Sequence, residues 1–356
     1  MQSSAPASKN PQKAGFPLIG WIGIAFSVAF LFWFGHDIET RELGAVLHEI
    51  SLPWVGLSAI VLLSEFWLRA LRWQVLLRPI QHTPYQPLLD ATLIGAAGNT
   101  LLPFRAGDIA RAAVASGSTG VRMTTVLATN VMERVYDLFG LVFVLLLTFL
   151  LLPEGLGNTP EDIQRIDKLA LFGKLVASVA VLGMLLFFAL ARNPKAARRF
   201  VGWFTRLTPR GIRNKIDELC RAFIDGLAAT QSLGQMGKAI LISLVLWFNL
   251  TLAVYLLFSA FSLDLPYAAA CFVTVAIALA VVIPQGPGYL GPFQSVIAAT
   301  ITLWTGAEMA QEAKAFAIVF WGVSFVPVTV WGLLRLRQAG LSLKQIWSDM
   351  RSSTIE

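Results

Sequence analysis

The chain has 356 residues, of which 56% are hydrophobic and only 14% are charged. A soluble domain usually carries about 25% charged residues, so the composition predicts an integral membrane protein and argues against a soluble enzyme. The net charge is +7. In a membrane protein such an excess sits in cytoplasmic loops, and since the chain carries no nucleic-acid-binding motif we expect no nucleic-acid partner.

The apolar runs predict an all-α integral membrane protein, because a helix needs about 20 apolar residues to cross the hydrocarbon core. Residues 1–15 are small and polar and predict a disordered cytoplasmic tail. Residues 16–337 form a single predicted transmembrane domain, and 338–356 a cytoplasmic C-terminal tail. About seven full spans are expected, at Phe16–Phe34, Leu52–Leu77, Thr124–Leu152, Leu169–Ala191, Ala239–Ala260, Tyr267–Ile283 and Ala315–Leu334. Two further apolar pieces, Leu88–Leu102 and Ser295–Trp304, are too short to cross.

The distribution of lysine and arginine predicts the orientation of these spans. Residues 192–238 hold ten basic residues against three acidic ones, whereas residues 153–168 are net acidic. Every basic segment lies inside if both termini are cytoplasmic, as the positive-inside rule requires. We therefore expect a multi-pass protein of a bacterial inner membrane. Apolar residues recur at helical spacing within 192–238, which predicts amphipathic helices that lie on the anionic inner leaflet or pack on the protein itself.

Ionisable residues within the apolar runs are the most informative ones, since a charge at the centre of a span costs roughly 2.5 to 3.5 kcal/mol. One helical face of the second span carries Glu65, Arg69 and Arg72. One side of the third span carries Asn130, Glu133, Arg134 and Asp137. The spacing predicts an intramembrane charge cluster with a role in function, or ion pairs that hold helices together.

Two short apolar pieces are interrupted in a similar way, about half the chain apart. Pro103 and Gly107 interrupt the first, and the second contains Pro284, Gly286, Gly288 and Tyr289. Proline removes a backbone donor and glycine permits non-helical angles. Such a pair in corresponding halves is typical of a transporter site. The pattern favours an inverted internal repeat with two re-entrant or broken helical hairpins that act as a gate, and the alternative is two ordinary kinks.

The residues around the first break suit a phosphate. Arg105, Asp108 and Arg111 flank it, and a helix that begins just after it would aim backbone N–H groups at a cavity. The second break offers backbone and Tyr289, which suit an apolar or neutral part of a ligand.

The strings GNTLLPFRAGDIARA, ATNVMERVYDLFG and PQGPGYLG resemble the lysylphosphatidylglycerol synthase/flippase transmembrane-domain family over roughly residues 15–335. The resemblance implies a membrane domain that moves or accommodates an anionic lipid, without the aminoacyl-transferring domain, so no synthesis of lysyl lipid is expected. The motif positions carried over are Asn99, Pro103, Arg105, Gly107, Asp108, Arg111, Glu133, Arg134 and Asp137.

The expected function is a lipid flippase or transporter that binds an anionic phospholipid or polyprenyl-phosphate lipid in an intramembrane cavity, with Asn99, Arg105, Asp108 and Arg111 at the phosphate. The alternatives are a membrane-embedded enzyme that modifies a glycolipid or polyprenyl phosphate, and a non-transporting scaffold of a lipid-modification complex. Histidines and cysteines lack metal-site spacing, so we expect no catalytic residue, metal or cofactor. A homo-oligomer or a lipid-modifying enzyme partner stays open.

Overall fold

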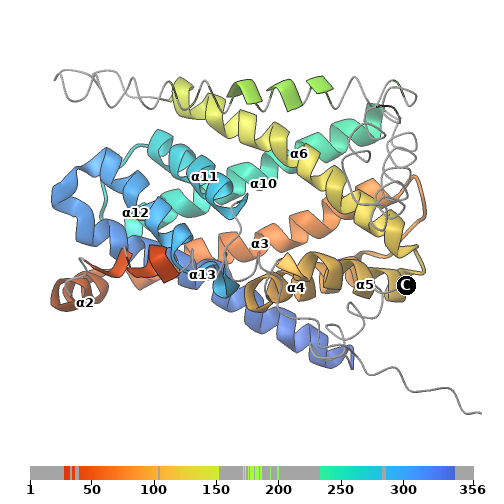
Figure 1. The fold of residues 1–356 in the computed structure, drawn as a ribbon, viewed down its shortest axis with the longest axis horizontal. Helices are drawn as coiled ribbons and strands as arrows, with labels where there is room; N and C mark the ends of the chain where they lie inside the picture. Colours follow the sequence, from red (N-terminus) through yellow and green to blue (C-terminus); the bar gives the residue numbers. More distant parts are fainter. Residues whose placement is uncertain are drawn as a thin grey trace, which may run out of the picture.

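The computed structural model describes residues 28–32, 34–36, 40–102, 105–151, 233–282 and 286–340, together with single residues and short stretches between 171 and 199. All regular secondary structure in these residues is helical. The predicted all-α class is therefore confirmed for the described part of the chain (Figure 1).

Four helices have 26 or more residues each: α3 (Leu52–Leu77), α6 (Met123–Leu150), α10 (Leu233–Ala260) and α13 (Ala310–Gln338). The shorter α-helices whose bounds the structure describes are α2 (Thr40–Glu49), α4 (Tyr85–Leu101), α5 (Gly107–Thr119), α11 (Tyr267–Val282) and α12 (Pro292–Thr305). Two 3-10 turns, η2 (Pro287–Tyr289) and η3 (Ala307–Met309), precede α12 and α13. The sequence did not predict α2, which follows the first predicted span.

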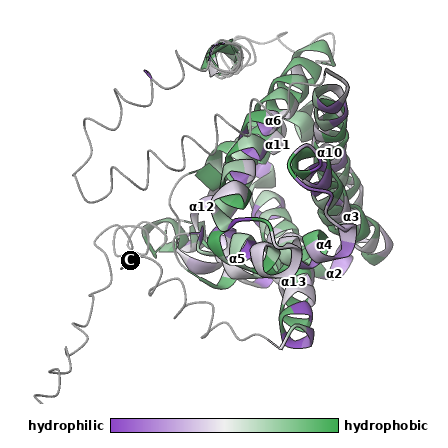
Figure 2. Ribbon diagram, turned by 90° about the vertical axis from the view of Figure 1, so that its right-hand side faces the viewer, coloured by the Kyte–Doolittle hydropathy of each residue, from purple (hydrophilic) through white to green (hydrophobic). Residues whose placement is uncertain are grey.

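Three of the described helices are long and apolar enough to cross a membrane: Leu52–Leu77, Gly234–Ala260 and Ala307–Gln338. Large apolar side chains lie exposed along α3, among them Ile60 at 65% and Leu52 at 72%. Lipid is the environment in which such a surface is stable, because a soluble monomer rarely exposes large apolar patches. Figure 2 shows that the helices are mainly hydrophobic along their lengths.

The other predicted spans are described only in part. Residues 28–32 and 34–36 are helical, as are those described between 171 and 186, and the rest of Phe16–Phe34 and Leu169–Ala191 lies outside the described residues. The same holds for the tail 1–15, most of the basic segment 192–238 and residues 341–356. The number of spans therefore stays a prediction.

The described helices repeat one order twice. A long helix, two short helices and a second long helix form the first series, α3, α4, α5 and α6, and then recur as α10, α11, α12 and α13. Helices α3 and α10 pack side by side and antiparallel (Figure 1). The amide of Ser51 donates to the carbonyl of Ala260 (2.9 Å) at one end, and Arg72 Nη1 donates to Ser243 Oγ (2.9 Å) at the other.

Helices α4 and α5 form an antiparallel hairpin whose close approach depends on glycine. A Cβ at Gly98 would lie 2.8 Å from the Cα of Gly107, and one at Gly107 would overlap the carbonyl oxygen of Gly95. Small residues let the backbones of membrane helices come this close. Gly120, in the left-handed conformation with a φ of 74°, ends α5. The first break thus separates two helices that fold back on each other.

Helices α11 and α12 form the second hairpin, in which the rings of Phe272 and Trp304 lie 6.5 Å apart. At its tip the amide of Gly291 donates to Gln294 Oε1 (2.7 Å), and Trp321 of α13 donates from Nε1 to the carbonyl of Gly288 (2.6 Å). These bonds satisfy backbone groups that the interruption of the helix frees, as membrane depth requires.

Each hairpin packs against the second long helix of the other series. Helix α4 lies on α13, where a Cβ at Gly332 would overlap the carbonyl oxygen of Leu93. Helix α11 lies on α6, where Leu141 and Val144 share a buried cluster with Cys271 and Val275. Pro103 and Pro284 lie outside the described residues. The described neighbours Leu102, before the first proline, and Gly286, after the second, have extended backbone angles, so neither segment is one continuous helix.

Candidate functional site

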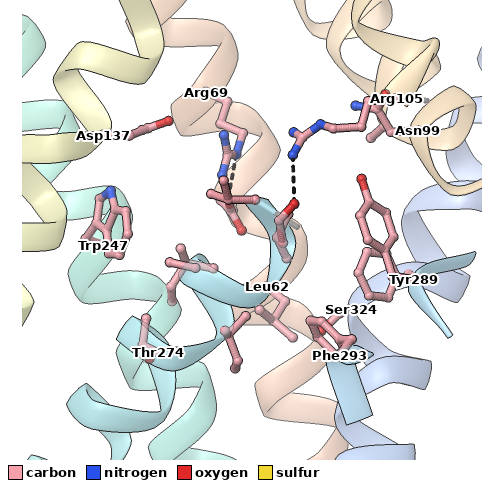
Figure 3. Close-up of a pocket in the computed structure, with 18 of the residues that line it drawn as sticks. Leu62, Arg69, Asn99, Arg105, Asp137, Trp247, Thr274, Tyr289, Phe293 and Ser324 are labelled. Atoms are coloured by element: carbon pink, nitrogen blue, oxygen red, sulfur yellow. Dashed lines mark hydrogen bonds and ion pairs between the residues drawn. The ribbon is translucent and has the colours of Figure 1, made fainter. Parts of the chain in front are cut away.

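A cavity of about 790 Å³ lies between the two hairpins and the four long helices (Figure 3). Its lining is polar on one side and apolar on the other. The charged lining residues are Glu65, Arg69, Arg105, Asp108, Arg111, Arg134 and Asp137. The apolar lining includes Leu62, Trp247, Leu250, Phe293, Phe320 and Phe325. Glu65 lies halfway along α3, so the cavity lies at mid-height of a helix long enough to cross a bilayer.

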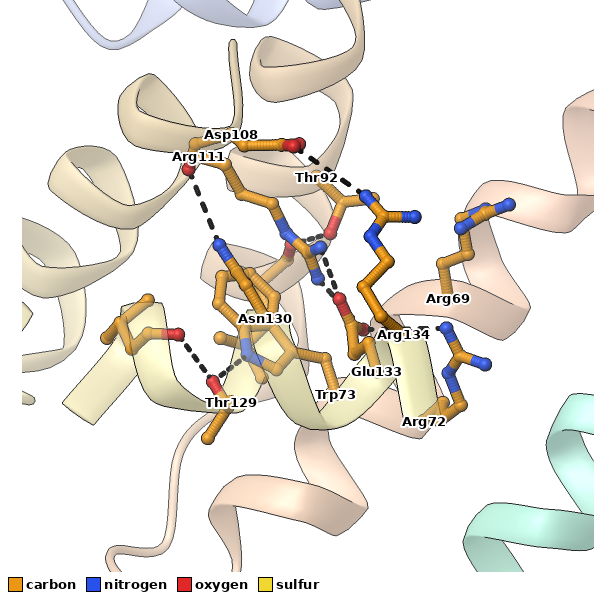
Figure 4. A network of polar contacts seen from close by, with 12 residues as sticks. Arg69, Arg72, Trp73, Thr92, Asp108, Arg111, Thr129, Asn130, Glu133 and Arg134 are labelled. Atoms are coloured by element: carbon orange, nitrogen blue, oxygen red, sulfur yellow. Dashed lines mark hydrogen bonds and ion pairs between the residues drawn. The ribbon is translucent and has the colours of Figure 1, made fainter. Parts of the chain in front are cut away.

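A buried ion pair joins the first hairpin to α6. Arg111 donates from Nη1 and Nη2 to the two carboxylate oxygens of Glu133, at 2.5 and 3.2 Å. Its guanidinium carbon also lies 3.8 Å from the ring centroid of Trp73 (Figure 4). Arg111 is 8% exposed and Glu133 4%. A pair this buried, with a cation–π contact, holds the hairpin on α3 and α6.

Two further arginines are anchored by carboxylates. Arg72 is fully buried and donates to Asp137 Oδ1 at 2.7 Å. Arg69 pairs with Glu65 one helical turn earlier. Together with the pair of Arg111 and Glu133, these contacts neutralise three arginines with three acids. Both the Nε and the Nη2 of Arg72 are buried without a hydrogen-bond partner, so the polar network retains unused donors.

The ion pairs around Asp108 are longer than the buried pairs. Asp108 Oδ2 lies 3.6 Å from Arg105 Nε and 3.6 Å from Arg134 Nη2. Arg134 also reaches Asp137 at 3.5 Å, and Asn99 Nδ2 donates to Asp108 Oδ1 at 2.9 Å. The Arg105 and Arg134 side chains are 37% and 52% exposed. One carboxylate is thus shared by two arginines at distances longer than those in the buried pairs.

Taken together, the polar network holds five arginines (Arg69, Arg72, Arg105, Arg111 and Arg134) and four carboxylates (Glu65, Asp108, Glu133 and Asp137). Its formal charge is therefore +1. The excess falls where Arg105 and Arg134 share Asp108, at the wall of the cavity.

The tips of the two hairpins meet at this wall. Arg105 Nη1 donates to the carbonyl oxygen of Val281, the residue before the last of α11, at 3.3 Å (Figure 3). Arg105 has a φ of 53° and Tyr289, at the other tip, a φ of 56°. Non-glycine residues adopt the left-handed region rarely and at an energetic cost, so both tips are held in a conformation that the surrounding structure imposes.

The two series line the cavity from matching positions. Counted from the first residue of each helix, Asp137 of α6 corresponds to Ser324 of α13. Thr92 of α4 corresponds to Thr274 of α11. All four side chains line the cavity. The frame is repeated, but the charges come from the first series alone.

The structure brings together most of the residues that the sequence singled out. Arg105, Arg111, Asn99, Asp108, Arg69, Arg134 and Tyr289 all line the cavity. Arg72 and Glu133 do not line the cavity, but Arg72 forms ion pairs with Glu133 and with the lining residue Asp137. Gly107, Gly286 and Gly288 lie at the hairpin tips. The amide of Asp108, which was expected to face a ligand, donates instead to Asn99 Oδ1 at 3.1 Å.

The sequence did not predict the apolar side of the cavity. Trp247, Phe293 and Phe325 come from apolar runs in which nothing distinguishes a cavity residue from a lipid-facing one. Ser324 was also missed, although a lone hydroxyl in an apolar run is a signal that could have found it. The described part of the chain holds no group of three or more His, Cys, Asp or Glu side chains that could hold a metal ion.

Known proteins resemble this chain over most of its length. A family model described as lysylphosphatidylglycerol synthase TM region matches residues 20–332. A "UPF0104 membrane protein" of Methanothermobacter thermautotrophicus is 26% identical over 324 residues, which are 88% of this chain and 93% of the relative. A "Glycosyltransferase AglD" of Haloferax volcanii is 26% identical over 304 residues, which are 79% of this chain but only 48% of that protein. No solved structure matches.

Proposed function

The chain belongs to the family of the lysylphosphatidylglycerol synthase transmembrane region, and we propose that it is a lipid translocator. The cavity between the hairpins would hold the headgroup of an anionic phospholipid or polyprenyl-phosphate lipid. The observation that carries this proposal is the division of the cavity wall into a charged side with a formal charge of +1 and an aromatic and aliphatic side. An amphiphile with one anionic group complements both sides.

Within this proposal Arg105 and Arg134 attract the phosphate. They share the carboxylate of Asp108, and their side chains are the most exposed of the five arginines. Arg111, which the sequence had assigned to the phosphate, donates both terminal nitrogens to Glu133. Moving it onto a ligand would take both hydrogen bonds from the buried carboxylate of Glu133, which costs several kcal/mol. We therefore assign Arg111 a supporting role, and Asn99 the role of orienting Asp108.

We further propose that the two series of helices are inverted relative to each other in the membrane. Helices α3 and α10 pack antiparallel, with hydrogen bonds from Ser51 to Ala260, from Ser58 to Ala253 and from Arg72 to Ser243. If both cross the bilayer, they do so in opposite directions, and the hairpins α4–α5 and α11–α12 enter from opposite sides. Inverted repeats with discontinuous helices at the midplane are typical of secondary transporters. Arg335 and Arg337 in the last turn of α13 favour a cytoplasmic C-terminus.

A translocation assay in proteoliposomes tests the proposal. Fluorescent phosphatidylglycerol in both leaflets is bleached from outside, and the protected fraction falls when protein exchanges lipid between leaflets. We expect the wild type to accelerate exchange, and Arg105→Ala and Arg134→Ala each to slow it about tenfold or more, because a hydrogen bond to a charged group contributes about 1.5–3 kcal/mol.

The matched control is Arg335→Ala. Arg335 pairs with Asp90 at 3.2 Å and does not line the cavity, so its loss should leave exchange unchanged. The proposal would be contradicted if the wild-type protein did not accelerate lipid exchange. It would also be contradicted if Arg335→Ala slowed exchange as much as Arg105→Ala.

A second candidate function rests on the name of the Haloferax relative, a glycosyltransferase of which this chain spans about half. A membrane-embedded enzyme that modifies a polyprenyl phosphate or glycolipid would need a base at the cavity, and Asp108 is the most exposed of its carboxylates. Conversion of a radiolabelled polyprenyl phosphate by the purified protein would favour the enzyme. A scaffold, the third alternative, needs no cavity at all, and intact lipid exchange by the purified chain would exclude it as the sole role.

A further inference from the structure

Tyr289, at the tip of the second hairpin, is fixed by a ring contact and by hydrogen bonds of the backbone around it. Its ring stacks on Phe325, with centroids 4.9 Å apart and an interplanar angle of 15°. The carbonyl of the preceding residue, Gly288, accepts the hydrogen bond from Trp321, and the Tyr289 amide donates to Gly286 at 3.3 Å. The residue is 8% exposed, so its ring has a fixed direction.

The hydroxyl of Tyr289 has no hydrogen-bond partner among the described residues. Figure 3 shows it pointing across the cavity toward Asn99 and Arg105, which belong to the other hairpin. The ring is largely buried while its hydroxyl is accessible from the cavity, and the left-handed backbone that aims it there, with a φ of 56°, is costly. A hydroxyl held in this way is suited to a ligand oxygen in the cavity.

Arg105 presents the same combination from the opposite tip. It too has a left-handed backbone and lines the cavity, and its bond to the Val281 carbonyl is long, at 3.3 Å. Of the three non-glycine residues with positive φ in the described chain, these are the two that line the cavity. The strain is thus concentrated at the two points that face each other across the charged side of the cavity.

We propose that the two hairpin tips form one headgroup subsite, in which Tyr289 donates a hydrogen bond to the phosphate that Arg105 and Arg134 attract. This inference rests on the proposed function and makes it more specific. The formal charge of +1 selects a single phosphodiester anion. A lipid diphosphate would leave at least one negative charge without a counter-charge beside an apolar wall, which is unfavourable.

The experiment measures binding of fluorescent lipids to the whole chain in nanodiscs. The probes share their acyl chains and differ in the headgroup: phosphatidylglycerol has one phosphodiester, diacylglycerol diphosphate has two phosphates and diacylglycerol has none. We expect phosphatidylglycerol to bind most tightly. Tyr289→Phe, which keeps the ring on Phe325, should weaken its binding about tenfold and leave diacylglycerol binding unchanged.

Tyr255→Phe is the matched control, because Tyr255 lies on α10, is 37% exposed and does not line the cavity. Unchanged phosphatidylglycerol binding in Tyr289→Phe, together with a clear loss in Arg105→Ala, would overturn the subsite and leave the proposed function intact. Tighter binding of the diphosphate would overturn the charge selection. Equal binding of phosphatidylglycerol and diacylglycerol by the wild type would overturn the proposed function itself.

A competition arm separates a lipid headgroup from free phosphate. Inorganic phosphate at millimolar concentration should displace little phosphatidylglycerol, because it gains nothing from the apolar wall. Full displacement would show that the site recognises free phosphate, and would overturn the assignment of a lipid.

Discussion

Removal of one partner from the buried pair of Arg111 and Glu133 should destabilise the protein strongly. In Glu133→Ala the guanidinium of Arg111 loses two hydrogen bonds, at 2.5 and 3.2 Å, while it remains 8% exposed. Arg72, whose Nη2 lies 4.0 Å from Glu133, loses part of its counter-charge as well. Breaking a buried ion pair in this way costs about 3–5 kcal/mol, and we expect a loss of that size in the free energy of unfolding.

The assay is unfolding in mixed micelles of increasing SDS fraction, followed by tryptophan fluorescence. The double variant Arg111→Leu/Glu133→Leu removes both charges, and replacement of a buried pair by apolar residues is often nearly neutral. It should therefore be more stable than Glu133→Ala by most of the 3–5 kcal/mol. If Glu133→Ala unfolds within about 1 kcal/mol of the wild type, an alternative partner or water stabilises Arg111, and the burial argument for this pair is wrong.

Three further predictions test the hairpins. Gly107→Ala should destabilise the protein by about 1–3 kcal/mol, because its methyl group would overlap the backbone of α4, whereas Gly117→Ala, with nothing within 4 Å, should be tolerated in the same SDS titration. Trp321→Phe removes the 2.6 Å bond to the second tip and should raise amide hydrogen exchange in residues 286–291, with unchanged exchange counting against that bond. Ser118→Cys and Ala307→Cys, both exposed, should react with an impermeant thiol reagent from opposite sides of the membrane, and labelling from one side would refute the inverted arrangement.

Local signals predicted the helices well where the apolar run coincides with the helix. The bounds of α3 agree with the predicted Leu52–Leu77, because polar residues and Pro53 mark its start clearly. Helix α13 begins at Ala310, five residues before the predicted start, since Glu312 and Lys314 are polar but helical. Helix α2 was missed because its apolar residues are few and its role depends on packing against α13.

The site was predicted in its members but not in its pairings. The sequence placed Arg105, Asp108 and Arg111 at one break, and all three line the cavity. It could not show which arginine is paired, since Glu133 lies 22 residues from Arg111 and reaches it only through the packing of α5 on α6. Nor could the sequence show that Tyr289 points toward Arg105, because this arrangement requires the two hairpins, which lie far apart in the chain, to meet.

The charged side chains that line the cavity all come from the first series of helices, so the electrostatic potential differs between its two sides. Asp137 and Asn99 of the first series correspond to Ser324 and Val281 of the second, counted from the first residue of each helix. The charges of the first series therefore favour one orientation of an anionic amphiphile over the other. If the chain translocates lipid as we propose, the headgroup must leave the charged side of the cavity before the lipid can reach the other leaflet.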